Sequence, residues 1–332
     1  MASLKEIAAQ TGVSYSLVSK VLSGRMGTTG VSAKTREAVL KKARELDYQP
    51  NRLAVALKSG RRGAIAVFIH GIGLPGSDLS SNFLLGLSGA FENSDLRLWL
   101  RFFQKDEEFR AACTPKLTRD VDGLIIAGIA HRGLIADLKA LEKKGLPVVS
   151  VFCTLPNNRS PLNIATDYRA QCYLATKHLI ELGCERIAHF HVLGMRYAGY
   201  AEALHEAGRS VQRRLVIRSA GFDLEDGSLA VRKLLENGEK FDGIVAQSDA
   251  QAIGAIRELQ RHGLRVPEDV KVTGVDDSPL ARICEVPVTS ATAEMDVCGR
   301  VAVETLKEKI EGKKVEPIVI RPRLVVRAST VV

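Results

Sequence analysis

The chain has 332 residues and lacks any long hydrophobic run. No stretch approaches the roughly 20 apolar residues that a helix needs to cross a bilayer. The first residues, MASLKEIAAQ, are charged early and lack the apolar core of a secretory signal. These absences predict a cytoplasmic protein with no membrane partner. The composition, 45% hydrophobic and 26% charged, is typical of a globular protein.

The sequence also lacks recognisable catalytic and metal-binding motifs. Its six cysteines form no C-x-x-C pair and its seven histidines form no H-E-x-x-H, while P-loop and G-x-S-x-G patterns are missing. Scattered cysteines of this kind indicate reduced thiols. His189 and His191 alternate along an expected strand, but two histidines lack the further ligands of a metal site. We therefore predict no catalytic residue, no cofactor and no metal.

One glycine-rich stretch, IAVFIHGIGLPG at 65–76, raises the alternative of a nicotinamide-dependent enzyme. Its Gly71-x-Gly73-x-x-Gly76 spacing is that of a dinucleotide-binding turn, in which a helix starts within the motif and faces the phosphates. Here Pro75 and a polar segment intervene, and helical periodicity begins only near Asn82. We favour a loop that lines a ligand cleft.

Acidic residues are scarce at the N-terminus. Residues 1–62 contain twelve Lys and Arg but four Asp and Glu, a net charge of +8 out of +9 for the whole chain. A small basic module on a nearly neutral larger one is typical of a nucleic-acid-binding arm.

Three short helices are expected in the same segment. Ser3 with Glu6 forms a capping box, Gly12 ends the first helix, and Ser14 and Ser32 are placed to cap the next two. The second helix carries apolar residues on one face and, on the other, Tyr15, Ser16, Ser19 and Lys20. Two helices joined by a glycine turn form a helix-turn-helix, whose second helix reaches base edges in the major groove. A three-helix bundle without a ligand is the alternative, which the charge disfavours.

The remaining 270 residues alternate between apolar runs and amphipathic segments. Strands are expected at AIAVFI, LRLWLRFF, DGLIIAG, PVVSVF, RIAHFHV, RLVIRS, DGIVAQS and VKVTGVD. Helical patterns lie between them, at residues 132–145, 171–183 and 228–238. This alternation predicts parallel sheets covered by helices, and eight strands suggest two such units.

Four segments together resemble the LacI/GalR family of bacterial transcription repressors. They are LKEIAAQTGVSYSLVSKVLSG, VSAKTREAVLKKARELDYQPNRLAVALKSG, LRVPEDVKVTGVDDSPLA and PRLVVRAST. The resemblance implies an all-α helix-turn-helix headpiece and an α/β core of two periplasmic-binding-protein-like (Rossmann-like) subdomains. It implies the following division: helix-turn-helix 1–48, hinge helix and linker 49–62, first subdomain 63–162 with 293–322, and second subdomain 163–292 with 323–332. Passages between subdomains are expected near 161–164, 290–294 and 321–324.

The resemblance also implies a homodimer that binds double-stranded operator DNA. Tyr15, Ser16 and Lys20 fall at base-reading positions, and Ser19 lies on the same exposed face. A short hinge helix follows Pro50, beginning at Asn51, and we include Asn51 among the DNA-binding residues. Within it Leu57, beside Ala54, falls where the family inserts a leucine into the minor groove. Leu17 stands where the family more often has threonine.

A small effector, such as a sugar, a nucleoside or a related metabolite, is expected in the core cleft. The resemblance implies effector contacts at Arg196 and Asp276, and further candidates are Phe83, Asp167, Phe222 and Ser248. Ligands of open α/β units bind outside the carboxyl ends of strands, and arginine offers five donors to hydroxyls or a carboxylate. Five of these candidates have a simpler alternative: a surface arginine at 196, a turn-forming aspartate at 276 or 277, a helix N-cap at 167, and core positions for both phenylalanines.

Three differences from the family pattern concern the cleft. Ser248 replaces the usual asparagine and follows Gln247, Ser80-Ser81 replace an Asn-Pro pair, and the loop before Arg196 is shorter than is common. The predicted function is a sequence-specific transcriptional regulator, most simply a repressor, whose operator affinity depends on the effector. Whether the effector induces or co-represses stays open.

Overall fold

The structure is a computed structural model that describes residues 3–23, 30–48, 61–70, 78–92, 96–128, 132–151 and 162–331. The chain divides into two compact units, residues 1–62 and residues 63–332. Among the described residues, no helix is both long enough and apolar enough to cross a membrane.

The described residues of the first unit form three helices, α1 (Leu4–Thr11), α2 (Tyr15–Ser23) and α3 (Ala33–Glu45). Their starts follow the predicted caps. The hydroxyl oxygens of Ser3, Ser14 and Ser32 accept backbone N–H groups three residues later, at 3.1–3.2 Å. Gly12 ends α1 with φ at 68°, a left-handed conformation that glycine adopts without a Cβ clash. A small apolar core holds the helices together, formed by Ile7, Val18, Val21, Val39 and Ala43.

The first half of the core is a six-stranded sheet in the order β11-β5-β4-β3-β1-β2, with parallel pairing throughout. Its strands are β1 (Ala64–His70), β2 (Arg97–Phe103), β3 (Gly123–Gly128), β4 (Val148–Val151), β5 (Asn163–Thr166) and β11 (Ile318–Ile320). Its helices are α5 (Leu79–Phe91), α6 (Asp106–Ala112), α7 (Pro115–Asp120), α8 (Ile135–Lys143) and α14 (Met295–Ile310), with a 3-10 turn at Arg132–Leu134.

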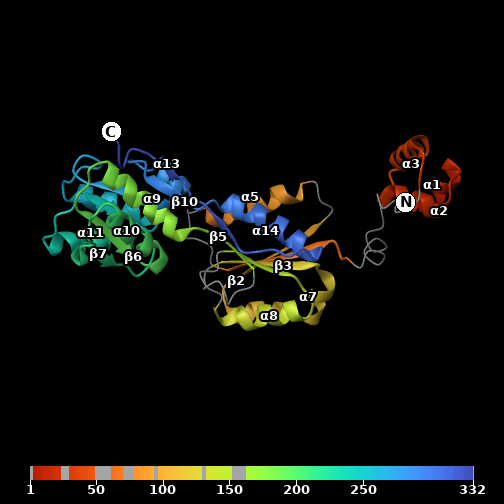
Figure 1. The fold of residues 1–332 in the computed structure, drawn as a ribbon, viewed down its shortest axis with the longest axis horizontal. Helices are drawn as coiled ribbons and strands as arrows, with labels where there is room; N and C mark the ends of the chain where they lie inside the picture. The colour runs from red at the N-terminus through yellow and green to blue at the C-terminus, as the bar shows by residue number, and fades with distance from the viewer. Residues whose placement is uncertain are drawn as a thin grey trace. The chain divides into compact units, whose positions relative to one another are not determined.

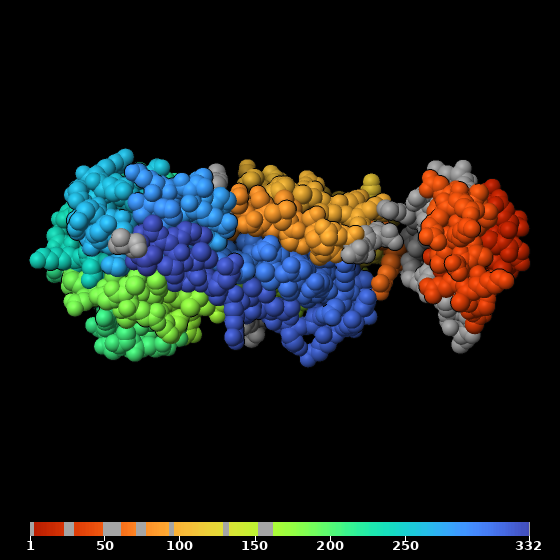
Figure 2. All heavy atoms as spheres, turned by 90° about the horizontal axis from the view of Figure 1, so that it is seen from above, coloured from red at the N-terminus to blue at the C-terminus, as the bar shows by residue number. Residues whose placement is uncertain are grey.

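Alternate residues of β1 enter two different apolar cores, as the period of two along a strand requires. Ile65, Val67 and Ile69 pack with α5 and α14, whereas Ala64, Ala66 and Phe68 pack toward α6, α7 and α8. Helices therefore cover both faces of this sheet (Figure 1). Helix α5 and helix α14 lie side by side and are visible as adjoining orange and blue surfaces (Figure 2). The two helices can approach this closely because Gly86 has no side chain. A Cβ at this position would lie only 1.9 Å from the Asp296 carbonyl oxygen.

The second half is a sheet in the order β12-β10-β9-β8-β6-β7, in which only the β10–β12 pair is antiparallel. Its strands are β6 (Ile187–His191), β7 (Val216–Arg218), β8 (Gly243–Val245), β9 (Lys271–Asp276), β10 (Thr289–Thr292) and β12 (Leu324–Val325). Its helices are α9 (Tyr168–Glu181), α10 (Gly194–Glu206), α11 (Leu224–Glu236), α12 (Asp249–Arg261) and α13 (Pro279–Ile283), with a 3-10 turn at Arg213–Leu215. Helices α9 and α10 pack on one face, and α11 and α12 on the other.

The predicted fold class is confirmed, and the eight predicted strands are present with ends that differ from the prediction by at most three residues. Four further strands, β5, β10, β11 and β12, lie where the chain passes between the sheets. The first passage follows Thr166, because residues 163–166 belong to the first sheet and not to the second as the resemblance implied. The other passages follow Thr292 and Ile320.

Hydrogen bonds tie the three passages to one another. The Thr166 hydroxyl donates to the Ala293 carbonyl oxygen, and the Asp167 N–H donates to the Ile320 carbonyl oxygen at 2.9 Å. The Thr292 N–H donates to the Arg323 carbonyl oxygen at 2.9 Å. The three segments thus form one connected joint between the two sheets.

Candidate functional site

The exposed face of α2 is a candidate DNA-binding surface. Tyr15 is 53% exposed and Ser16 is also exposed, while Ser19 and Lys20 are half-buried. These four side chains lie on the outer face of α2 because Val18 and Val21, on its opposite face, are buried against the other helices. Leu17 packs against the same core, which gives this unusual residue a structural role.

Several predicted positions lie outside the described residues. These are the hinge-helix positions Asn51, Ala54 and Leu57, and the glycine motif Gly71-x-Gly73-x-x-Gly76. They stay predictions.

Arg196 lies in the first turn of α10, with its side chain only 7% exposed. The surface alternative for this arginine is therefore wrong. Its Nη2 donates to Asp276 Oδ1 at 3.3 Å, and its Nη1 donates to the Gln247 carbonyl oxygen. Its Nε donates to Gln171 Oε1 at 3.2 Å. Burying an arginine requires such partners, since an unpaired charge in the interior is strongly destabilising.

Two aromatic rings flank the same guanidinium group. Its central carbon lies 5.4 Å from the ring centroid of Tyr168 and 5.9 Å from that of Phe222. At these distances the negative faces of the rings attract the cation. Phe222 is half-buried, and its ring lies beside Arg196. The contact between Tyr168 and Arg196 was not anticipated from the sequence.

Asp276 ends strand β9 with a left-handed backbone, φ 110°. Burial raises the pKa of its carboxyl group to about 6, and the attraction of Arg196 offsets part of that rise. Asp277, the next residue, has a different set of partners, with ion pairs to Arg327 at 2.5 Å and Arg282 at 2.9 Å. The two adjacent aspartates therefore point to separate arginines, and Asp276 is the one that meets Arg196.

A buried polar frame fixes the start of α10. Gln247 Oε1 accepts the Leu193 N–H at 2.7 Å, and its Nε2 lies 2.8 Å from His189 Nε2. His189 is fully buried, and burial lowers its pKa to about 3, so its ring is neutral. The ring accepts the amide proton of Gln247. Among the described residues, no three His, Cys, Asp or Glu side chains could hold a metal ion.

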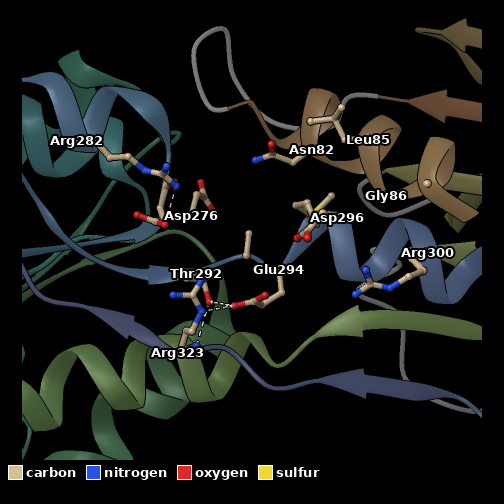
Figure 3. A pocket seen from close by; sticks show the side chains of 14 residues that line it. Asn82, Leu85, Gly86, Asp276, Arg282, Thr292, Glu294, Asp296, Arg300 and Arg323 are labelled. Atoms are coloured by element: carbon tan, nitrogen blue, oxygen red, sulfur yellow. Dashed lines mark hydrogen bonds and ion pairs between the residues drawn. The ribbon is translucent and has the colours of Figure 1, made fainter.

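A cavity of about 490 Å³ is lined by Asp276 and by other residues of both subdomains. Figure 3 shows Asp276 and Arg282 at one side, and Asn82 and Leu85 of α5 opposite them. Its volume is within the range of small-molecule sites, about 300–1,000 Å³. Its charged lining residues are Asp276, Asp277, Arg282, Glu294, Asp296, Arg300 and Arg323.

The remaining predicted residues are placed differently. Phe83 is wholly buried in the core that includes α5 and α14, so it presents no face to a cleft, in agreement with its core alternative. Asp167 caps α9 by accepting the Ala170 N–H at 2.9 Å. Ser248 caps α12 by accepting the Gln251 N–H at 3.0 Å and donates to the Phe222 carbonyl oxygen at 2.5 Å. Ser248 therefore holds Phe222 in place.

Sequence reasoning missed Gln171 entirely and noticed Gln247 only as an unusual residue. Both are fully buried and contact Arg196. Gln171 could have been suspected from its place on the apolar face of a helix, one turn before Ala175 and two before Leu179, where an uncharged polar residue needs a partner.

The first unit is a helix-turn-helix with an exposed polar face, and the second has two α/β sheets joined by three passages, with a polar cavity between their residues. This combination defines the class of regulators that join a DNA-binding head to a ligand-binding core.

Comparison with known proteins agrees. Residues 3–51 match the bacterial regulatory proteins of the lacI family, and residues 176–330 match a periplasmic binding protein-like domain. The chain is 31% identical to the HTH-type transcriptional regulator CelR of Thermobifida fusca over 337 residues, covering 98% of this chain and 97% of that protein. A solved CelR–cellobiose complex has a TM-score of 0.71 at 29% identity, covering 99% and 100% of the two chains. The lac repressor dimer bound to operator and the anti-inducer ONPF, 24% identical, has a TM-score of 0.73 over 100% and 99% and shows the shared fold.

The chain belongs to the LacI family of bacterial regulatory proteins. It is a DNA-binding transcriptional regulator.

Proposed function

We propose that this regulator is a dimeric cytoplasmic repressor whose operator affinity is set by a small metabolite bound in the core. It acts by occupying DNA and carries out no chemical reaction. The observation that carries the proposal is the buried Arg196–Asp276 ion pair, of which Asp276 lines a cavity that residues of both subdomains border. A ligand held there contacts both subdomains and so favours one of their relative arrangements.

The pair offers both kinds of hydrogen-bonding group. Three of the five guanidinium N–H groups of Arg196 have acceptors among the described residues, which leaves one on each Nη nitrogen. Asp276 supplies carboxylate oxygens. Adjacent hydroxyls, one accepting from Arg196 and one donating to Asp276, fit this arrangement, and the ring of Phe222 suits the apolar face of a sugar or a base. A sugar or a nucleoside is therefore the proposed effector class.

For DNA, we propose that Tyr15, Ser16 and Lys20 contact base edges, that Ser19 on the same face of α2 also contacts DNA, and that Asn51, Ala54 and Leu57 contact the operator centre. The +8 charge of residues 1–62 supports this assignment, because phosphate contacts by Lys and Arg supply most of the affinity for DNA.

For the dimer, we propose the exposed edge strand β2. Its side chains Leu98, Trp99, Leu100 and Phe102 are 38–56% exposed. An unpaired apolar edge is a ready template for association, and a second copy of this chain is its proposed partner.

A thermal-shift screen of sugars, nucleosides and NAD against the full chain tests the effector proposal, since a ligand that binds only the folded state raises its melting temperature. We expect a sugar or a nucleoside to stabilise the wild type and to lose its effect in Arg196→Met. Stabilisation by NAD alone, in both proteins, would favour the nicotinamide alternative instead.

A further inference from the structure

Gln171 joins Arg196 to one of the passages between the two sheets. Its side chain is wholly buried in the first turn of α9. Its Oε1 accepts a hydrogen bond from Arg196 Nε at 3.2 Å, and its Nε2 donates to the Thr292 carbonyl oxygen at 2.9 Å. One amide group thus bonds the arginine on one side and the backbone of β10 on the other.

Thr292 is the residue at which the second and third passages meet. Its hydroxyl accepts the Arg323 N–H at 3.0 Å and donates to Glu294 Oε1 at 2.7 Å. Glu294 Oε1 also accepts from Arg323 Nε at 3.1 Å, and these residues lie together in Figure 3. A displacement of Thr292 therefore displaces both passages.

The chemistry of this position requires an amide. The arginine can only donate and the carbonyl can only accept, so the bridging side chain must accept on one side and donate on the other. Glutamate would accept from Arg196 but would set an oxygen against the Thr292 carbonyl oxygen. Methionine would fill the space and bond neither. Only one orientation of the glutamine amide satisfies both partners.

We propose that Gln171 is a positioning residue that transmits a change at Arg196 to the passages between the subdomains. The inference rests on the proposed function, in which Arg196 contacts the effector. Effector binding that shifts the guanidinium group pulls on the Gln171 amide, which in turn shifts Thr292 and the segments bonded to it.

The test measures backbone amide hydrogen exchange at residues 289–296 and 321–325 in the full chain, without effector or DNA. Arg196→Lys keeps a cation for Asp276 but lacks the Nε that Gln171 binds. In the wild-type background we expect Arg196→Lys to speed exchange in both segments about three- to tenfold, the effect of losing one buried hydrogen bond. In the Gln171→Met and Gln171→Glu backgrounds, where the bridge is already broken, it should add nothing.

Gln251 provides the matched control. It is also a fully buried helix glutamine, whose side chain accepts from the Gln247 N–H and donates to the Gly221 carbonyl oxygen. Among the described residues, it bonds neither Arg196 nor a passage. In a Gln251→Met background, Arg196→Lys should keep its full effect. Gln171→Glu has nearly the shape of glutamine, so it keeps the test decisive if the methionine variant folds poorly.

Two results would overturn the proposal. Equal acceleration by Arg196→Lys in every background would mean that the arginine acts on the passages through Asp276 and the neighbouring strand. No acceleration in any background would mean that the arginine and the passages are independent. Either result leaves the thermal-shift and operator experiments untouched, because no effector or DNA is used, so failure of this inference is distinct from failure of the proposed function.

Discussion

Asp276 and Thr292 are directly paired residues of the adjacent parallel strands β9 and β10. Asp276 ends its strand in an ion pair with Arg196, and Thr292 ends its strand at a passage to the first sheet. The proposed effector contact and the joint between subdomains are therefore neighbours in one sheet. A small ligand acting at this edge is well placed to change how the two sheets are arranged.

The buried ion pair should be costly to break. Arg196→Met leaves the Asp276 carboxylate buried without its cation, which costs about 3–5 kcal/mol of unfolding free energy at pH 8. Chemical denaturation measures this loss. The exposed pair Arg265–Asp269, 2.7 Å apart, is the control. Arg265→Met should leave the denaturation midpoint nearly unchanged because solvent screens that pair. Equal effects of the two substitutions would show that Arg196 is not held as described.

The stability contributed by two buried carboxyl groups should fall as pH rises through the acidic range. Burial raises the pKa of Asp249 to about 7 and that of Asp276 to about 6, from an ordinary 3.8. The folded chain therefore holds these protons more tightly than the unfolded chain, and the stabilisation present below pH 4 is lost by about pH 7.

Asp249→Asn removes the larger of these two effects. As the pH rises from 4 to 8, the wild type loses the stabilisation that the Asp249 proton provides, and the variant has none to lose. The unfolding free energy of the variant minus that of the wild type should therefore increase by about 1–4 kcal/mol over this range. Asp269→Asn is the control, since hydrogen bonds from Arg265 lower the pKa of Asp269 to about 2 and its ionisation is complete across this range. A pH-independent difference for Asp249→Asn would place the proton elsewhere.

Dimer formation should depend on the exposed edge of the first sheet. A lysine in place of Trp99 puts a charge in the proposed apolar interface and should raise the dimer dissociation constant tenfold or more, about 1.4 kcal/mol. Analytical ultracentrifugation measures it. Val319, 63% exposed on the opposite edge strand β11, is the matched position. An effect of Val319→Lys equal to that of Trp99→Lys would move the interface away from β2.

Sequence preference in DNA binding should follow the exposed face of α2. Lys20→Ala or Tyr15→Ala should change the preferred half-site, at about 1–3 kcal/mol for each lost base contact. Binding-site selection on the full chain reads this directly. Lys34→Ala, on the exposed surface of α3, should lower affinity for all sequences alike. An unchanged consensus in the α2 variants would reassign these residues to phosphate contacts.

The sequence predicted the strands that lie within longer apolar segments and missed β5, β10, β11 and β12, which lie where the chain passes between the sheets. Strand β1 is a continuous apolar run, whereas β10 reads Thr-Ser-Ala-Thr, and its buried hydroxyls become favourable only through partners such as Thr330 and Arg323 far along the chain. Strand β12 has two residues, too few for a period of two to be visible. Strand β11 has three, the same length as the predicted β7 and β8, but it lies between Pro317 and Pro322.

The site divides in the same way. Arg196 and Asp276 were found through family resemblance, but their mutual ion pair spans 80 residues and no local pattern encodes it. For Phe83 the sequence left a core and a cleft position open, because a phenylalanine near a loop has the same sequence pattern in both cases, and the folded chain buries its ring in the core. Gln171 has no motif, since its role is defined by Arg196 and Thr292, which only the folded chain brings together.

The most direct test of an effector-controlled repressor is reciprocal binding. Operator affinity of the full chain is measured by fluorescence anisotropy with and without the effector found in the thermal-shift screen, and effector affinity is measured by calorimetry with and without operator. Linkage requires the two ratios to be equal, and coupling of about 1–3 kcal/mol predicts a 5–150-fold change. The account predicts equal ratios in this range for the wild type and a lost effector response in Asp276→Asn. An effector that binds at Arg196 and Asp276 but leaves operator affinity unchanged would contradict it.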